Sequence, residues 1–186
     1  MGWERGHRIP LALELLLCVF AGLGIAVLIR SYVAEFYLVP SGSMLETIHE
    51  GDRLLGEKLS LRASTPKAGD VVTFDDPDDP GTTLIKRVVA VGGQTVELRD
   101  GAVWVDGRAL DEPYVQGRPS YPLQQHSRLL DADVRYPFVV PEGCIWVMGD
   151  NRTNSLDSRY FGAVSVGSVT SRGLFIYWPL TDARWL

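Results

Sequence analysis

Histidine and cysteine are scarce in this chain of 186 residues, which contains three histidines and two cysteines. Cys18 lies in a long apolar run and Cys144 in a distant strand-like segment, so we expect no disulfide between them, and they lack the spacing of metal ligands. His7, His49 and His126 are scattered, and none stands in a setting typical of a catalytic base. The sequence therefore predicts neither a metal ion nor a cofactor.

Basic residues are also fewer than acidic residues. Lysine and arginine together number 18 against 23 acidic residues, which gives a formal net charge of -5. No basic stripe runs along any segment, and this argues against nucleic acid as a partner. Proline and glycine are frequent after residue 39, a composition that favours strands and turns over long helices.

The longest apolar run covers residues 11–29 and reads LALELLLCVFAGLGIAVLI. As a helix it would extend over about 28 Å, close to the thickness of one bilayer core. Glu14 is the only charge within it, near the end where the side chain can reach the interface. Arg5 and Arg8 precede the run and Arg30 follows it, which favours a cytoplasmic N-terminus with the bulk of the chain outside.

Two alternatives to an uncleaved anchor were weighed. A cleaved signal peptide has a shorter apolar core and small residues before the cleavage point, whereas Tyr32 stands two residues before Ala34 here. A buried helix of a soluble protein would show a polar face, and this run has none. We therefore expect a short cytoplasmic segment over 1–10, a transmembrane anchor over 11–29 and an extracytoplasmic domain over 30–186.

The outer part of the chain predicts a mainly β domain. Short β-branched and aromatic runs alternate with Gly, Pro and Asp turns, and no βαβ alternation occurs. Strands are expected over residues 32–39, 53–59, 71–74, 82–91, 94–99, 102–105, 144–150 and 162–180. Residues 111–141 are polar and irregular, so about 97–142 is interpreted as a hairpin with a small inserted β subdomain on a sheet-like or barrel-like body.

The first candidate for chemistry is Ser43, in the stretch VPSGSMLETI over residues 39–48. A serine hydroxyl needs a base, and without a suitable histidine the next candidate is a neutral lysine amine. At its usual pKa only about one lysine in 2,500 is neutral at pH 7, so the base must be desolvated. Lys58 and Lys67 have surface-like contexts, whereas Lys86 stands in the middle of the apolar strand TTLIKRVVAV. The alternative for Lys86 is an outward-facing strand position.

Five segments in order, PSGSM, GDRLLGEK, GDVVTF, LIKRVVAVGG and GDNRTNSLDSRYFG, resemble the consecutive conserved boxes of bacterial type I signal peptidases. The resemblance covers nearly the whole chain, although residues 111–141 carry little of it. It implies a membrane-anchored serine endopeptidase that removes signal peptides from secretory preproteins. The implied partners are those signal peptides and membrane lipid, while the oligomeric state stays open.

The resemblance implies a role for each matching residue. Ser43 would be the nucleophile and Lys86 the general base. The oxyanion hole would combine the Ser43 backbone N–H with the Ser41 hydroxyl, and Ser155 would hydrogen-bond the lysine amine. Structural support would come from Arg87, Asp150, Asp157 and Arg159, with Arg87 paired to Asp150. The shallow substrate pockets would be lined by Tyr37, Val39, Ile48 and Ile85.

The sequence departs from the family pattern at Glu46, where proline is frequent, and at Gly92 and Gln94, where a Pro-Gly-Asp turn is common. Two other functions stay open at this point: a self-cleaving Ser–Lys regulator of the SOS-repressor type, and a catalytically inert anchored binding domain. The late aromatics are expected either at the membrane interface or in the core; they are Phe175, Tyr177, Trp178 and Trp185.

Overall fold

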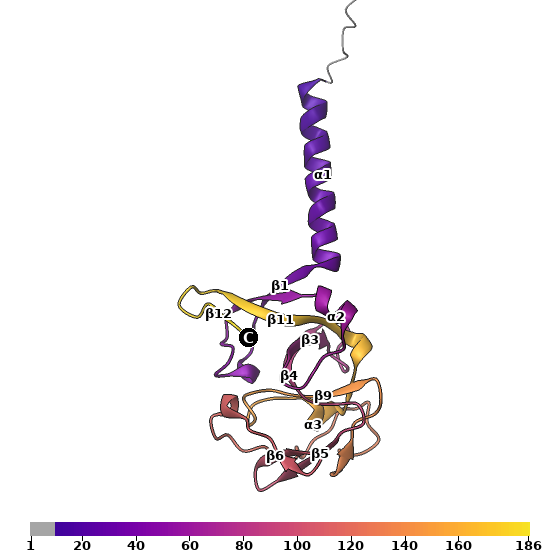
Figure 1. Ribbon diagram of the computed structural model, residues 1–186, viewed down its shortest axis with the longest axis vertical. Helices are drawn as coiled ribbons and strands as arrows, with labels where there is room; N and C mark the ends of the chain where they lie inside the picture. Colours follow the sequence, from indigo (N-terminus) through magenta and orange to yellow (C-terminus); the bar gives the residue numbers. More distant parts are fainter. Residues whose placement is uncertain (1–9) are drawn as a thin grey trace, which may run out of the picture.

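A long N-terminal helix projects from a β-rich body in the computed structural model, which describes residues 10–186 (Figure 1). The expectations for Arg5, His7 and Arg8 fall outside this range. The helix α1 covers Leu11–Tyr32, and none of its residues is buried. It runs three residues beyond the expected end at Ile29, because no proline or glycine stops it there; the prediction of strand at Tyr32 was therefore wrong.

The main sheet is antiparallel and has eight strands. Its order is β1-β2-β11-β3-β4-β9-β10, and β12 pairs with β11. The strands are β1 (Ala34–Leu38), β2 (Arg53–Glu57), β3 (Val71–Asp75), β4 (Thr83–Val91), β9 (Cys144–Met148), β10 (Val164–Ser165), β11 (Val169–Trp178) and β12 (Arg184–Trp185). The prediction of a mainly β body is confirmed.

A second, four-stranded sheet lies at the end of the body away from the helix (Figure 1). Its order is β7-β6-β5-β8, from β5 (Thr95–Arg99), β6 (Ala102–Val105), β7 (Arg108–Ala109) and β8 (Phe138–Val139). Asp100-Gly101 closes the β5–β6 hairpin with positive φ at both residues, 51° and 78°, as a type I′ turn requires. These strands fall largely within the segment expected to form an inserted subdomain.

Short helices occur where strand or loop was expected. The helices are α2 (Leu59–Ala63), α3 (Ser158–Phe161), η1 (Gly42–Met44), η2 (Pro113–Val115) and η3 (Val166–Ser168). Helix α3 begins at Asp157, whose side chain accepts a hydrogen bond from the backbone N–H of Arg159 as an N-cap. Strand β2 ends at Glu57, because the Glu57 carboxylate accepts a hydrogen bond from the Ser60 backbone N–H in the first turn of α2.

Three apolar clusters hold the body together, and one of them supports the serine turn. This cluster is formed by Val39, Met44, Ile48, Leu54, Val71 and Ile176. Strand β4 lies between β3 and β9, so its backbone is paired along both edges, and Lys86, Val88, Val89 and Ala90 on it are buried. The consequence for function is that β4 can hold a polar side chain away from water.

Candidate active site

Asn151 fixes the turn that carries Ser43, through its side-chain amide and its backbone N–H. Ser43 lies in η1 and is 8% exposed. The amide of Asn151 donates a hydrogen bond to the Gly42 carbonyl at 2.9 Å, and the Asn151 backbone N–H donates to the Ser43 carbonyl at 3.0 Å. Ser41, directly before this turn, is exposed. The turn therefore has fixed backbone geometry while one of its two hydroxyls remains open to solvent.

Lys86 lies within hydrogen-bonding distance of Ser43. Its Nζ is 2.9 Å from the Ser43 Oγ and 3.0 Å from the Ile85 carbonyl oxygen, and the side chain is 3% exposed. Burial among apolar neighbours lowers the pKa of Lys86 to about 8, and the charges of Asp157, Asp76 and Asp150 partly oppose that shift. An amine with this pKa can accept a proton from a serine hydroxyl at neutral pH.

Arg87, the next residue along β4, makes a bidentate ion pair with Asp150. Its Nε and Nη2 lie 2.8 and 2.7 Å from the two carboxylate oxygens. Asp150 also accepts a hydrogen bond from the Thr47 hydroxyl at 2.5 Å. Thr47 follows Ser43 in the chain, so this carboxylate connects the serine turn to the lysine strand.

A second bidentate pair fixes the loop after β9. Arg159 binds Asp157 through Nε and Nη2, each at 2.9 Å, and both side chains are buried. Besides the N-cap hydrogen bond from the Arg159 backbone N–H, Asp157 accepts one from the Gly149 backbone N–H at 3.0 Å. Arg152 extends the network to Glu112 in the segment before η2, with contacts of 2.6 and 2.9 Å.

Ser155 does not make the expected hydrogen bond to the Lys86 amine. Its Oγ is buried and has no hydrogen-bond partner among residues 10–186. The Lys86 Nζ instead contacts Ser43 and the Ile85 carbonyl, while Ser155 faces Gly149, where an added Cβ would lie 2.3 Å from the Ser155 Oγ. Only glycine fits at position 149.

A small pocket of about 40 Å³ lies beside the turn and contains three of the four expected substrate-pocket residues. Its lining comprises Tyr37, Leu38, Val39, Pro40, Thr73, Thr83, Leu84 and Ile85. Ile48 is not part of the lining, because it is fully buried in the cluster below the turn. The pocket is thus formed by residues of β1, β3 and β4 next to the turn that carries Ser43.

The departures from the family pattern have local partners. Glu46 accepts a hydrogen bond from Arg118 at 2.9 Å, and this contact lowers the pKa of Glu46. The Gln94 side chain accepts a hydrogen bond from the Val91 backbone N–H at 3.0 Å and donates to Asp106 at 2.9 Å, so it closes the turn after the lysine strand.

Sequence reasoning missed Thr47, Asn151 and Arg152. All three lie in stretches that were singled out for their composition, but their roles depend on partners that are distant in the chain. For Asn151 and Arg152, the available signal in the sequence was the high content of Asn, Arg and Asp in residues 149–162.

The family model described as "Signal peptidase, peptidase S26" matches residues 12–178. The chain belongs to this family. A probable signal peptidase I-1 from Synechocystis sp. is 39% identical over 174 residues, which cover 90% of this chain and 82% of that protein. The signal peptidase I of Mycobacterium tuberculosis is 34% identical over 202 residues, covering 83% and 68%.

A solved structure, a signal peptidase I from Enterococcus faecalis, is 33% identical with a TM-score of 0.47, and the match covers 59% of this chain and 97% of that one. Membership of the peptidase S26 family thus rests on the sequence matches, which span both the serine turn and the lysine strand.

Proposed function

We propose that the protein is a membrane-anchored signal peptidase I, in which Ser43 is the nucleophile and Lys86 the general base. The observation that carries this proposal is the 2.9 Å contact between the Ser43 Oγ and a lysine amine whose side chain is 3% exposed. Such a pair is the arrangement that nucleophilic catalysis requires, an alcohol next to a base of matched pKa. Family membership supplies the substrate class, the signal peptides of preproteins.

In the reaction, the neutral Lys86 amine accepts the Ser43 proton as Oγ attacks the scissile carbonyl carbon. The resulting oxyanion is stabilised by the Ser43 backbone N–H and the Ser41 hydroxyl, where loss of one donor typically costs about 2.7–4 kcal/mol. The Lys86 ammonium then protonates the leaving amine, and the C–N bond breaks. A water activated by the same amine hydrolyses the ester and restores the Ser43 hydroxyl.

The rest of the network positions these groups. Asn151 holds the turn, and Asp150 connects Thr47 to Arg87 beside the lysine. Asp157 and Arg159 fix the backbone of the loop that faces the turn. We infer that Ser155 is a further hydrogen-bond partner for the Lys86 amine, because its buried hydroxyl has no other partner among residues 10–186.

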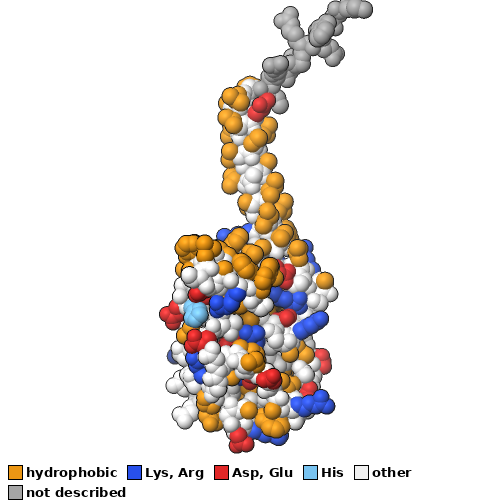
Figure 2. All heavy atoms as spheres, turned by 60° about the vertical axis from the view of Figure 1, so that its left-hand side comes forward, with side chains coloured by type: hydrophobic (Ala, Val, Ile, Leu, Met, Phe, Trp, Pro, Cys, Tyr) orange, Lys and Arg blue, Asp and Glu red, His pale blue; other side chains and the backbone are white. Residues whose placement is uncertain are grey.

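Helix α1 is proposed as the membrane anchor. Its 22 residues correspond to about 33 Å, enough to cross a bilayer core of about 30 Å. The helix stands clear of the body, and its surface is apolar along its length (Figures 1 and 2). The charge bias around the run supports a cytoplasmic N-terminus, with the catalytic domain outside and the second sheet as its inserted subdomain.

The face of the body next to α1 is also apolar (Figure 2). Strands β1, β11 and β12 lie at this end of the body (Figure 1), and the exposed apolar side chains on them and on the turn between β11 and β12 are Phe36, Leu38, Trp178, Leu180 and Trp185. Two of the four late aromatics, Trp178 and Trp185, are thus exposed, whereas Phe175 and Tyr177 are partly buried against other rings. This arrangement supports contact with lipid, which would hold the active site near substrates tethered in the same bilayer.

The test is cleavage of a preprotein that has small residues at the −1 and −3 positions, by full-length protein in detergent. Ser43→Ala and Lys86→Ala should each abolish cleavage, while Lys67→Ala, in an exposed loop, should leave it unchanged. Full activity in either dyad variant would contradict the assignment. Cleavage of the protein's own chain alone would instead favour a self-processing regulator, and no cleavage at all would favour a binding domain.

A further inference from the structure

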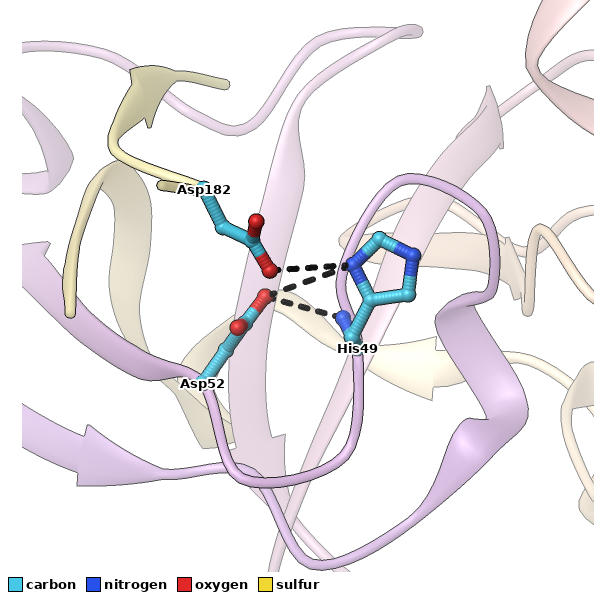
Figure 3. A group of neighbouring side chains, drawn as sticks. All are labelled: His49, Asp52 and Asp182. Atoms are coloured by element: carbon cyan, nitrogen blue, oxygen red, sulfur yellow. Dashed lines mark hydrogen bonds and ion pairs between the residues drawn. The ribbon is translucent and has the colours of Figure 1, made fainter. Parts of the chain in front are cut away.

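Three side chains outside the dyad converge from segments that lie far apart in the sequence. His49 and Asp52 belong to the loop between η1 and β2, and Asp182 to the turn between β11 and β12 (Figure 3). The His49 Nδ1 is 3.6 Å from an Asp182 oxygen and 4.0 Å from an Asp52 oxygen. All three ligand-type atoms lie within 4.8 Å of one another.

These separations suit a shared cation better than direct hydrogen bonds. A hydrogen bond between nitrogen and oxygen is typically about 2.7–3.2 Å long, shorter than both contacts. Around a tetrahedral zinc ion, bonds of about 2.0–2.1 Å place neighbouring ligand atoms about 3.3–3.4 Å apart. Small side-chain rotations would bring the three atoms onto one ion.

Charge and burial also favour a bound cation between these three side chains. Asp52 is 1% exposed, and the His49 Nδ1 is out of contact with solvent and has no hydrogen-bond partner within residues 10–186. In that same range no lysine or arginine forms an ion pair with Asp52 or Asp182. A buried carboxylate next to a second carboxylate is costly unless a positive charge lies between them.

The surrounding contacts orient the candidate ligands. The His49 backbone N–H donates to the Asp52 carboxylate at 2.9 Å and fixes its position. On the far side of the imidazole, Nε2 lies 3.6 Å from Glu46, beyond direct hydrogen-bonding distance, so the rotation that brings His49 onto the ion would also have to bring these two groups into contact; Arg118 holds this carboxylate at 2.9 Å. A carboxylate behind a ligating histidine is the usual outer contact of a metal site.

We propose that His49, Asp52 and Asp182 form a binding site for a divalent transition metal of the zinc type, with Glu46 as the carboxylate that orients the histidine. One imidazole nitrogen and two carboxylate oxygens are a ligand set typical of zinc and unlike the all-oxygen sets of magnesium or calcium. The bound ion connects the C-terminal turn to the loop that follows Ser43. Arg184 makes a parallel connection, because its guanidinium donates to the Thr47 carbonyl.

The test is zinc titration of the full-length, tag-free protein in detergent after treatment with a chelator, followed by calorimetry. One zinc per chain should bind, and His49→Asn and Asp182→Asn should each weaken binding at least tenfold. Glu46→Gln should weaken it by about 10–100-fold, the usual effect of losing an outer contact. Zinc at 100 times its Kd should raise the Tm of the wild type by about 5–10 °C.

The chain supplies a matched control in His126, whose Nδ1 lies 2.7 Å from a single exposed carboxylate, that of Asp133. His126→Asn should bind zinc as the wild type does. The proposal is overturned if the wild type shows no saturable 1:1 binding, if magnesium binds equally well, or if zinc affinity depends on His126 rather than His49. The wild-type titration decides the matter even where a variant fails to fold.

Discussion

The pH dependence of cleavage follows from the burial of Lys86. With a pKa of about 8, roughly one amine in eleven is neutral at pH 7. At the ordinary lysine pKa of 10.5 only about one in 3,000 would be neutral, so burial increases the competent fraction about 300-fold. The rate constant kcat/KM should track this fraction, since the neutral amine is the form that accepts the serine proton.

Below pH 8 the expected slope is about tenfold per pH unit, and above it the rate should level off. Between pH 6 and pH 9 the neutral fraction rises from about 1% to about 90%, so kcat/KM should increase about 90-fold. The assay is initial-rate cleavage of a peptide substrate without titratable groups near the scissile bond, by full-length protein in a nonionic detergent. Circular dichroism at each pH checks that the fold persists.

A variant that removes a charge near Lys86 tests whether the pH profile reports the titration of this residue. The negative charge of Asp76 raises the pKa of Lys86, so Asp76→Asn should move the midpoint of the profile to lower pH. Asp79→Asn, a change in an exposed residue of the same turn, should leave the midpoint in place. A flat profile between pH 6 and pH 8, or a midpoint near that of a free lysine, would refute the reasoning.

Four further outcomes are expected. Lys86→Met should be inactive yet more stable. The depressed pKa means that burial of the charged Lys86 amine lowers the free energy of unfolding by about 3 kcal/mol at pH 7, and the variant regains this less about 1 kcal/mol for the lost hydrogen bonds. Its Tm should therefore rise by about 4–8 °C in calorimetry. The wild type itself should gain stability between pH 8 and 10.5, where the unfolded chain binds more protons, and a stability that fell across this window would contradict the assigned pKa. Asn151→Leu should lower kcat about 10–100-fold with an unchanged pH midpoint, because the Gly42 carbonyl loses its donor and no charge is added near Lys86; an unchanged kcat would show that this hydrogen bond is dispensable. Ile85→Ala should enlarge the small pocket and relax the preference for small side chains, which competition between substrate peptides measures directly.

Local sequence was sufficient to place the strands around the dyad. The run TTLIKRVVAV is β-branched and apolar, so residue type alone predicted a strand, and β4 covers Thr83–Val91; alternation left open whether Lys86 faces inward or outward on it. The turn at Ser43 followed from Pro40 and Gly42, which end the preceding strand.

Other features depend on contacts between distant segments, which local patterns do not encode. Asn151 reaches Gly42 across 109 positions, and Arg152 reaches Glu112 across 40. Ser155 lies so close to Gly149 that a Cβ there would be 2.3 Å from its Oγ, a tertiary contact that the motif does not encode. Ile48 was assigned to the pocket by the resemblance, but packing of β2 and β11 beneath the turn buries it. The end of α1 was predicted too early, because hydropathy indicates where the chain would leave the lipid, whereas the helix continues until the backbone conformation changes.

The most direct test of the dyad is the site at which a serine-directed acylating inhibitor attaches. Intact-mass and peptide-mapping measurements on the full-length protein should find one adduct, on Ser43, formed at a rate that rises with pH up to about pH 8. The adduct should be missing from Ser43→Ala and should form at a rate reduced by orders of magnitude in Lys86→Met. Acylation at another residue, or an undiminished rate in the Lys86 variant, would contradict the assignment of nucleophile and base.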